Sequence, residues 1–343
     1  MLNTKNTVEQ LKIESVDQFR REVLGASVPK LLKGFVSEWK IVRQAKDAHA
    51  LFGYLKKFDS KKEVDVLAGR PEIEGKFFYK EGYKELNFEK KRGLVTDVLD
   101  QILENLKVQG GSTYYLQSLS VNEFFQGLAQ ENPIGILPPQ IEPRIWIGNA
   151  LTVQTHFDLS DNLACVVEGT KKFTLFPPEQ TANLYLGPLE FTLSGPPVSL
   201  VDVEAPDYKK YPRYKEAESK AIIAEVEQGD ALYVPYFWWH HVKSTAPINV
   251  MINYWWSDAK ADLSSPFDAL LLSLLSIKGL PDRYKYAWQQ MFQSLVFSQS
   301  HDAGAHLPED VRGVLGALNG REISERKARL ARKLAIEAGV AKG

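Results

Sequence analysis

Residues 152–158 read TVQTHFD and residues 235–241 read PYFWWHH, and these two stretches carry most of the information in the chain about its architecture and chemistry. In the first stretch, His156 and Asp158 lie two residues apart, and side chains with that spacing leave a β-strand on the same face. The second stretch supplies another imidazole from a distant, aromatic-rich strand end. Two histidines and one carboxylate on one face can form a metal site that leaves coordination positions open.

The second stretch offers two adjacent histidines, His240 and His241, after two tryptophans, Trp238 and Trp239. Neighbouring residues of a strand point in opposite directions, so only one histidine should face a metal, and local parity does not choose between them. Large aromatic side chains beside a metal site exclude water and bound a substrate pocket. Packing in the core is the alternative interpretation of the tryptophans.

From Ser112 onward the chain is rich in short β-like runs, and Glu168-Gly169-Thr170 between two of them predicts a hairpin turn. Many short strands separated by turns favour a barrel or sandwich, and the lack of regular helices between them argues against a doubly wound sheet. The predicted strands lie at residues 113–119, 144–150, 152–158, 163–169, 171–176, 230–234 and 248–256. The stretch 177–229 is rich in Pro, Gly and Tyr and is expected to be a long excursion between strands.

Helical periodicity dominates the two ends of the chain. We expect helices at residues 9–25, 93–107, 266–277, 282–298 and about 321–338. The predicted organisation is therefore an N-terminal α/β segment at 1–110, a β-rich core at 111–258 and C-terminal helices at 259–343.

Composition excludes several classes of protein. The formal net charge is −1, so the chain lacks the basic footprint expected for nucleic-acid or anionic-membrane binding, and nucleic acid is disfavoured as a partner. Its apolar runs are too short to span a membrane. Cys165 is the only cysteine, which rules out an intramolecular disulfide and a thiolate metal cluster and favours a reducing, cytoplasmic setting.

Lys171 begins the strand after the predicted turn, and by itself it would be interpreted as a solvated surface lysine. A metal-bound 2-oxo acid, however, needs a buried cation for its far carboxylate, with polar side chains nearby to complete the hydrogen bonding. Tyr115 and Gln117 alternate onto one face of their strand and are candidates for that role. Asn253 has the same option on the last strand.

These segments together resemble those of a known family. The chain resembles the JmjC-type, cupin-fold 2-oxoglutarate oxygenases, in particular the asparaginyl hydroxylase of hypoxia-inducible factor and its bacterial relatives, over roughly residues 110–258. The resemblance is carried by Tyr115-Leu116-Gln117, His156-Phe157-Asp158, the run from Lys171 to Gln180, Gly229-Asp230, the run from Trp238 to Val242, and Ile252-Asn253-Tyr254-Trp255.

The resemblance implies a role for several of these residues. It makes His156, Asp158 and His240 the Fe(II) ligands, because the family uses the first histidine after the paired tryptophans. It makes Lys171 the partner of the distal carboxylate of 2-oxoglutarate, with Tyr115 beside it. Trp238, Trp239, Trp255 and Gln117 are then expected to bound the substrate pocket.

One position departs from the family pattern. The family hydroxylase has a threonine three residues before its first histidine, and this chain has Val153 there. Thr155 or Thr152 is expected to replace that co-substrate contact, or the contact is absent. Asn162 and Asn253 match amide residues that lie near the co-substrate in the family.

The implied fold is mainly β with flanking helices: a double-stranded β-helix, the cupin or JmjC-like jelly roll, with a C-terminal helical segment. The C-terminal helices are expected to form a homodimer or, alternatively, to cover the barrel. The implied function is oxidation by O2, Fe(II) and 2-oxoglutarate, with hydroxylation of a protein side chain or a small molecule. The alternatives are a metal-binding cupin-type sensor without turnover and a cupin enzyme that uses no 2-oxo acid.

Overall fold

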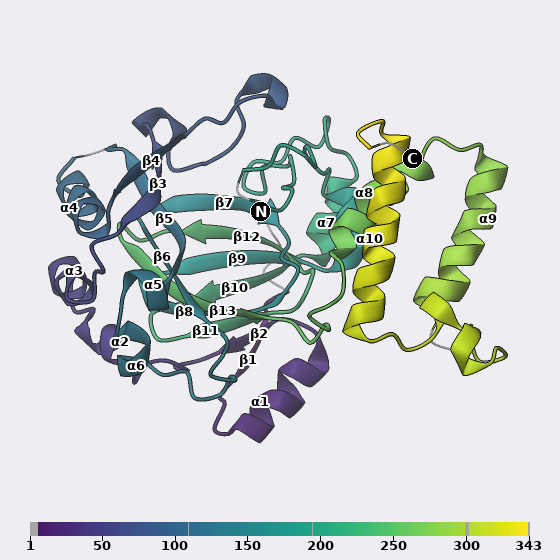
Figure 1. The fold of residues 1–343 in the computed structure, drawn as a ribbon. Coiled ribbons are helices and arrows are strands. Elements are labelled where there is room, and N and C mark those ends of the chain that lie inside the picture. Colours follow the sequence, from purple (N-terminus) through teal and green to yellow (C-terminus); the bar gives the residue numbers. More distant parts are fainter. Residues whose placement is uncertain (1–5, 109, 194, 299–301, 342–343) are drawn as a thin grey trace. The chain divides into compact units, whose positions relative to one another are not determined.

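The computed structural model describes residues 6–108, 110–193, 195–298 and 302–341. The chain divides into two compact units, Met1–Ser257 and Asp258–Gly343. In the first unit, the described residues form a nine-stranded sheet in the order β1-β2-β11-β8-β13-β6-β5-β3-β4 and a four-stranded sheet in the order β10-β9-β12-β7 (Figure 1). The strands are β1 (Glu9–Leu11), β2 (Lys30–Leu32), β3 (Glu63–Gly69), β4 (Glu89–Leu94), β5 (Thr113–Ser120), β6 (Pro143–Gly148), β7 (Leu151–His156), β8 (Asp161–Glu168), β9 (Lys171–Phe176), β10 (Ile222–Val226), β11 (Ala231–Val234), β12 (Trp239–Ser244) and β13 (Asn249–Trp256).

The helices of the first unit lie mainly before and between the strands of the larger sheet. They are α1 (Val16–Glu22), α2 (Lys40–Gln44), α3 (Ala48–Lys56), α4 (Val95–Asn105), α5 (Val121–Phe124), α6 (Leu128–Glu131) and α7 (Tyr214–Lys220). The second unit contains α8 (Pro266–Ser276), α9 (Asp282–Phe292) and α10 (Gly320–Glu337). Across the described ranges, no helix combines the length and apolar composition needed to cross a membrane.

Alternation along β8 shows how the layers are built. Leu163, Cys165 and Val167 belong to the core that packs against the helices, whereas Ala164 and Val166 belong to the apolar cluster between the two sheets. Successive side chains of a strand leave on opposite faces, so a strand covered on both sides reads as a continuous apolar run. The predicted mainly β fold with flanking helices is confirmed.

The turn after β8 joins the two sheets, and the predicted hairpin there is wrong. β8 pairs with β11 and β13, whereas β9 pairs with β10 and β12. Gly169 makes this crossing with a φ of +83°, and a Cβ there would lie 2.6 Å from the carbonyl oxygen of Ile248. A tight turn between two β-rich runs does not reveal whether the strands pair with each other or with more distant partners.

Two further expectations are corrected by tertiary pairing. Residues 9–25, predicted as one helix, split into β1 and α1 because Glu9–Leu11 pairs in parallel with Lys30–Leu32. The side chain of Ser15 then caps α1 by accepting a hydrogen bond from the Gln18 amide. The excursion at 177–229 contains α7 and β10.

The predicted segments 1–110 and 111–258 share one sheet. β1 and β2 extend the larger sheet beyond β11, and β3 and β4 extend it beyond β5. The N-terminal third therefore lengthens both edges of the sheet that forms one wall of the barrel.

Candidate metal centre

One end of the barrel interior contains a cavity of about 420 Å³. Its walls come from alternate residues of the strands, as expected where one face of every strand points inward. These inward-facing side chains are Tyr115 and Gln117 on β5, Arg144 and Trp146 on β6, Asn162 and Ala164 on β8, Lys171 and Phe173 on β9, His240 and Val242 on β12, and Met251, Asn253 and Trp255 on β13.

Three potential metal ligands meet in this cavity. His156 at the end of β7 pairs directly with His240 at the start of β12, and their ring centroids are 4.3 Å apart. Asp158 follows β7, and its Oδ2 lies 3.6 Å from Nε2 of His240. The potential ligand atoms of the three residues all lie within 4.8 Å of one another, which is close enough for one ion to contact all three.

The residue between His156 and Asp158 anchors the segment in the core. The ring of Phe157 is buried, and its centroid lies 4.2 Å from that of Phe237 and 4.7 Å from that of Trp239. The carbonyl of Asp158 accepts a hydrogen bond from the Phe237 amide at 3.0 Å. Burial of the middle side chain on one side holds the flanking imidazole and carboxylate on the other.

Both histidines are oriented by a backbone carbonyl two residues earlier in the chain. Nδ1 of His156 lies 2.8 Å from the carbonyl oxygen of Gln154, and Nδ1 of His240 lies 2.9 Å from that of Trp238. A carbonyl oxygen can only accept, so each Nδ1 carries the proton and each Nε2 keeps its lone pair for a metal. Burial, together with the neighbouring His156, lowers the pKa of His240 to about 4, which favours the neutral ligand form.

The neighbouring His241 faces the other way. It lines a separate hollow on the outer side of the smaller sheet, with Lys172, Glu204 and Lys243. The structure therefore resolves the choice that parity left open, because only His240 shares a cavity with His156 and Asp158.

Lys171 lies buried in the same cavity, where it is 3% exposed. Its ammonium donates a hydrogen bond of 2.7 Å to the hydroxyl of Ser244, the residue directly opposite it on β12. It forms no ion pair with any residue in the described part of the chain. Burial lowers the pKa of Lys171 to about 8, as expected for a cation held without a counter-charge.

Polar side chains surround this lysine. Tyr115 is buried, and burial raises the pKa of its hydroxyl. The indole of Trp146 donates to Oδ1 of Asn253 at 2.6 Å, and the amide of Asn253 donates to Oδ1 of Asn162 at 3.0 Å. This chain of bonds fixes both amides and leaves the Asn162 amino group as the donor available to the cavity.

The predicted substrate-pocket residues separate into two groups. Gln117 and Trp255 line the cavity. Trp239 does not, because it follows the opposite parity from His240, is fully buried and donates its indole N–H to Thr181 at 3.0 Å. Trp238 packs against the apolar cluster between the two sheets. Trp239 therefore packs in the core, whereas Trp238 is half-buried and is not among the residues that line the cavity.

The structure also separates Thr155 from the cavity. His156 pairs with His240, but Val153 pairs with Val242, so β7 carries one extra residue at this point. The bulge reverses the parity and turns Val153 inward. Thr155 is fully buried elsewhere, and its hydroxyl has no hydrogen-bond partner among the described residues. Thr152 is likewise buried outside the cavity lining, so neither threonine supplies the contact that the family threonine makes.

Sequence reasoning missed four polar or aromatic residues that line the cavity, Ser118, Arg144, Trp146 and Gln154, and it missed Ser244, which accepts a hydrogen bond from Lys171. Alternation within Pro143–Gly148 could have placed Arg144 and Trp146 on one face. No local signal identifies Ser244, because its contact with Lys171 depends on the pairing of β9 with β12.

Comparison with known proteins agrees with this fold. A family model described as a cupin-like domain matches residues 16–262. Among curated proteins, JmjC domain-containing protein C of Dictyostelium discoideum is 31% identical over 159 residues, which cover 44% of this chain and 37% of that protein. Jumonji C domain-containing protein 5 of Drosophila melanogaster is 24% identical over 261 residues, covering 73% of this chain and 59% of that protein.

A shorter stretch of this chain is similar to part of a plant protein. Lysine-specific demethylase JMJ31 of Arabidopsis thaliana is 35% identical over 112 residues, which cover 32% of this chain and 20% of that protein. The chain thus spans between a fifth and three fifths of the length of these curated relatives.

Proposed function

Because the chain belongs to the family of cupin-like domains, we propose that it is a 2-oxoglutarate- and Fe(II)-dependent oxygenase that hydroxylates a protein side chain or a small molecule. One observation carries the proposal: a group of two histidines and one carboxylate shares a cavity with a buried lysine that has no ion-pair partner among the described residues. The first group suits a ferrous ion, and the lysine suits a dicarboxylate beside it.

The donor set fits the metal. Nε2 of His156, Nε2 of His240 and a carboxylate oxygen of Asp158 would hold the ion on one side, and the cavity lies on the other side. When bound, iron together with 2-oxoglutarate supplies the activation of O2 for oxidation of a substrate C–H bond. The protein residues bind, orient and shield these reactants.

The opposite end of the cavity fits the far carboxylate of 2-oxoglutarate. Lys171 would donate a charge-assisted hydrogen bond to that carboxylate, and Ser244 keeps the ammonium aimed into the cavity. Tyr115 and the amino group of Asn162 would add neutral donors. A dianion in this position would also supply the counter-charge that Lys171 otherwise lacks.

Apolar side chains between the two ends exclude water. Ala164, Phe173, Val242 and Met251 line the cavity between the polar groups. In such surroundings hydrogen bonds and charges act with little solvent screening, so positioning by a few donors is effective.

The proposal is tested by measuring succinate released from 2-oxoglutarate by the purified chain. Succinate should form only when Fe(II), O2 and 2-oxoglutarate are all present, and omission of any one should reduce it to background. Binding of 2-oxoglutarate without release of succinate would favour the alternative of a metal-binding sensor without turnover. Absence of both binding and succinate would favour a cupin protein that uses no 2-oxo acid.

The C-terminal unit supports a second proposal, a homodimer. Among its described residues, no hydrophobic side chain is fully buried, although α8 is mostly apolar. Leu275 is 86% exposed, and Trp288 and Phe297 are 47% and 64% exposed. Exposed apolar surface on this scale marks an interface, and a second copy of the same helices offers a complementary one.

Light scattering on the full chain tests the dimer. A Leu275→Glu variant should shift the mass toward the monomer, because a charge would be buried in an apolar contact. Gln101→Glu, an exposed change on α4, is the control and should leave the mass unchanged. A wild-type chain that stays monomeric at high concentration would contradict the proposal.

A further inference from the structure

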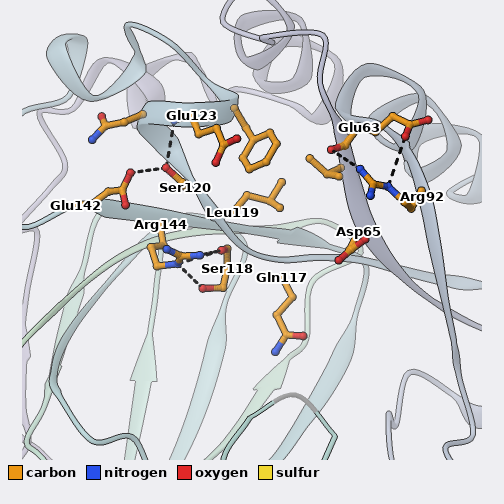
Figure 2. A pocket seen from close by; sticks show the side chains of 13 residues that line it. Glu63, Asp65, Arg92, Gln117, Ser118, Leu119, Ser120, Glu123, Glu142 and Arg144 are labelled. Carbon is orange, nitrogen blue, oxygen red and sulfur yellow. Dashed lines mark hydrogen bonds and ion pairs between the residues drawn. The ribbon is translucent and has the colours of Figure 1, made fainter.

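A second hollow adjoins the metal cavity. It has a volume of about 740 Å³ and is lined by β3, β4, β5 and β6 and the segment that follows β5 (Figure 2). Three residues, Gln117, Ser118 and Arg144, line both this outer hollow and the metal cavity. They therefore stand where a substrate that enters from the outer hollow would meet the reaction centre.

Arg144 is the charged member of this group, and its guanidinium is firmly held. Nε donates to the carbonyl oxygen of Ser118 at 3.0 Å and to its hydroxyl at 2.6 Å, and Nη2 donates to the same carbonyl at 2.5 Å (Figure 2). Both hydrogens of Nη1 are left without an acceptor among the described residues. The guanidinium is thus fixed on one edge and available on another.

Backbone strain supports this arrangement. Ser118 has a φ of +53°, which a residue with a side chain seldom adopts. The pairing of β5 with β6 is interrupted between Leu116 and Leu119, so Ser118 sits in a bulge of the strand. Strained residues and bulges occur preferentially where a side chain must be re-aimed at a ligand site.

Most other charges in the outer hollow are paired. Arg92 lies 3.5 Å from Glu63, and Glu123 lies 3.2 Å from Lys62. Within the described residues, Arg144 has no ion-pair partner, and neither has Asp65 or Glu142, which line only the outer hollow. The carboxylate of Glu142 accepts a hydrogen bond from the hydroxyl of Ser120. Among the unpaired charges of the outer hollow, Arg144 is accordingly the one that also lines the metal cavity.

Charge balance in the metal cavity points to the ligand. If the proposed function holds, the ferrous ion and Lys171 offset Asp158 and the dianionic 2-oxoglutarate. Among the described residues that line the metal cavity, no second carboxylate then offsets the positive charge of Arg144. A guanidinium with free N–H groups on one edge matches a planar carboxylate.

We propose that Arg144 is a specificity-determining residue that binds a carboxylate of the primary substrate, so that the substrate is a carboxylate-bearing molecule oxidised beside that anchor. This inference rests on the proposed function, because it assigns the other cavity charges to iron and 2-oxoglutarate. The carboxylate can belong to a small free acid or to an acidic side chain of a peptide.

The test uses the full chain loaded with Mn(II) in the presence of saturating 2-oxoglutarate. Mn(II) is paramagnetic, so it increases the NMR relaxation rate of the protons of any probe that binds close to it. The probes are N-acetylglycine for a small acid, the capped tripeptide acetyl-Ala-Asp-Ala-amide for an acidic side chain, and their neutral amides as controls. Relaxation of the probe protons should rise for at least one acid and for neither amide. Arg144→Gln should weaken that binding about tenfold or more. Arg92→Gln, which changes a paired arginine of the same hollow, is the matched control and should leave it unchanged.

Calorimetry with 2-oxoglutarate separates the possible failures. Arg144→Gln should leave 2-oxoglutarate affinity unchanged; a loss comparable to that in Lys171→Ala would mean that Arg144 holds the co-substrate, which overturns the inference. The inference is also overturned if neither acid shows an increase in proton relaxation rate, or if the increase is equal in wild type and Arg144→Gln. If 2-oxoglutarate does not bind wild type, the proposed function fails, and the same titration with Mn(II) alone decides whether Arg144 still binds the acids.

Discussion

The two ends of the metal cavity are built in different ways. At the metal end, His156 and His240 are each oriented by a carbonyl two residues earlier in the same segment, at 2.8 and 2.9 Å. At the other end, Lys171 is held by Ser244, which is 73 residues away and is brought opposite by strand pairing. The metal end is thus encoded locally, whereas the lysine end depends on sheet register. Because each end has its own support, we expect them to respond independently to mutation.

The largest effect is expected at the metal end. Asp158→Ala removes one of the three proposed ligands and should weaken Mn(II) or Co(II) binding by about a hundredfold or more. This loss exceeds the one typical of removing a residue that only hydrogen-bonds to a metal ligand. Calorimetric metal titration measures it. His241→Asn, which alters the adjacent histidine on the opposite face, is the control. Equal loss in the control would contradict the assignment of His240.

A separate effect is expected at the lysine end. Lys171→Ala should raise the dissociation constant of 2-oxoglutarate more than about tenfold, because a charge-assisted hydrogen bond is lost. Metal affinity should stay unchanged, as judged by the same titration. If both affinities fall together, the two ends are not independent.

The pKa of Lys171, about 8, predicts a pH dependence. Below that pKa the ammonium is charged and can bind the far carboxylate, so 2-oxoglutarate affinity should be level. Above that pKa the lysine is neutral and must take up a proton when 2-oxoglutarate binds. The affinity for 2-oxoglutarate should therefore fall with rising pH, with a slope that approaches about tenfold per pH unit. Calorimetry from pH 6.5 to 9.5 measures this fall. Lys171→Arg, which stays charged throughout, should abolish the dependence on pH even if its affinity is lower.

A smaller effect is expected from the support of the lysine. Ser244→Ala removes the hydroxyl that accepts from Lys171 and should weaken 2-oxoglutarate binding about threefold to tenfold. Ser244→Thr keeps a hydroxyl and should lie closer to wild type. An unchanged affinity in Ser244→Ala would show that Lys171 is aimed without this contact.

The smallest effect is expected from restoring the family threonine. Val153 faces the cavity, so Val153→Thr places a hydroxyl there and should tighten 2-oxoglutarate binding about twofold to fivefold. Thr155→Val, on the buried opposite side, should leave affinity unchanged. A gain in the second variant and none in the first would mean that the bulge in β7 is absent in solution.

The contrast between the two ends also explains what could be predicted from sequence. His156 and Asp158 follow from two-residue spacing, and each of the seven predicted β-rich runs overlaps a strand of the structure. Lys171 was identified by resemblance, since spacing alone would leave it on the surface. Ser244 could not be found, because the register of β9 against β12 is a property of the folded sheet.

The errors have one physical cause, which is that parity and pairing are set by tertiary structure. The bulge in β7 moves Thr155 out of the cavity and Val153 into it. The turn at Gly169 joins two sheets, although it resembles a hairpin in sequence. Trp239 was the avoidable error, because a residue adjacent to an inward-facing His240 on a strand points outward.

The fixed imidazole tautomers also bear on which metal the proposed site would take up. A site whose ligands already point inward gains no selectivity from rearrangement, and Zn(II), Ni(II) and Cu(II) bind nitrogen and oxygen ligands more tightly than Fe(II) does. If the site takes Fe(II) as proposed, its loading in a cell depends on which divalent ions are available. The metal content of a purified sample will report its growth medium as much as its chemistry, and reconstitution under anaerobic conditions after chelation becomes the starting point for any assay.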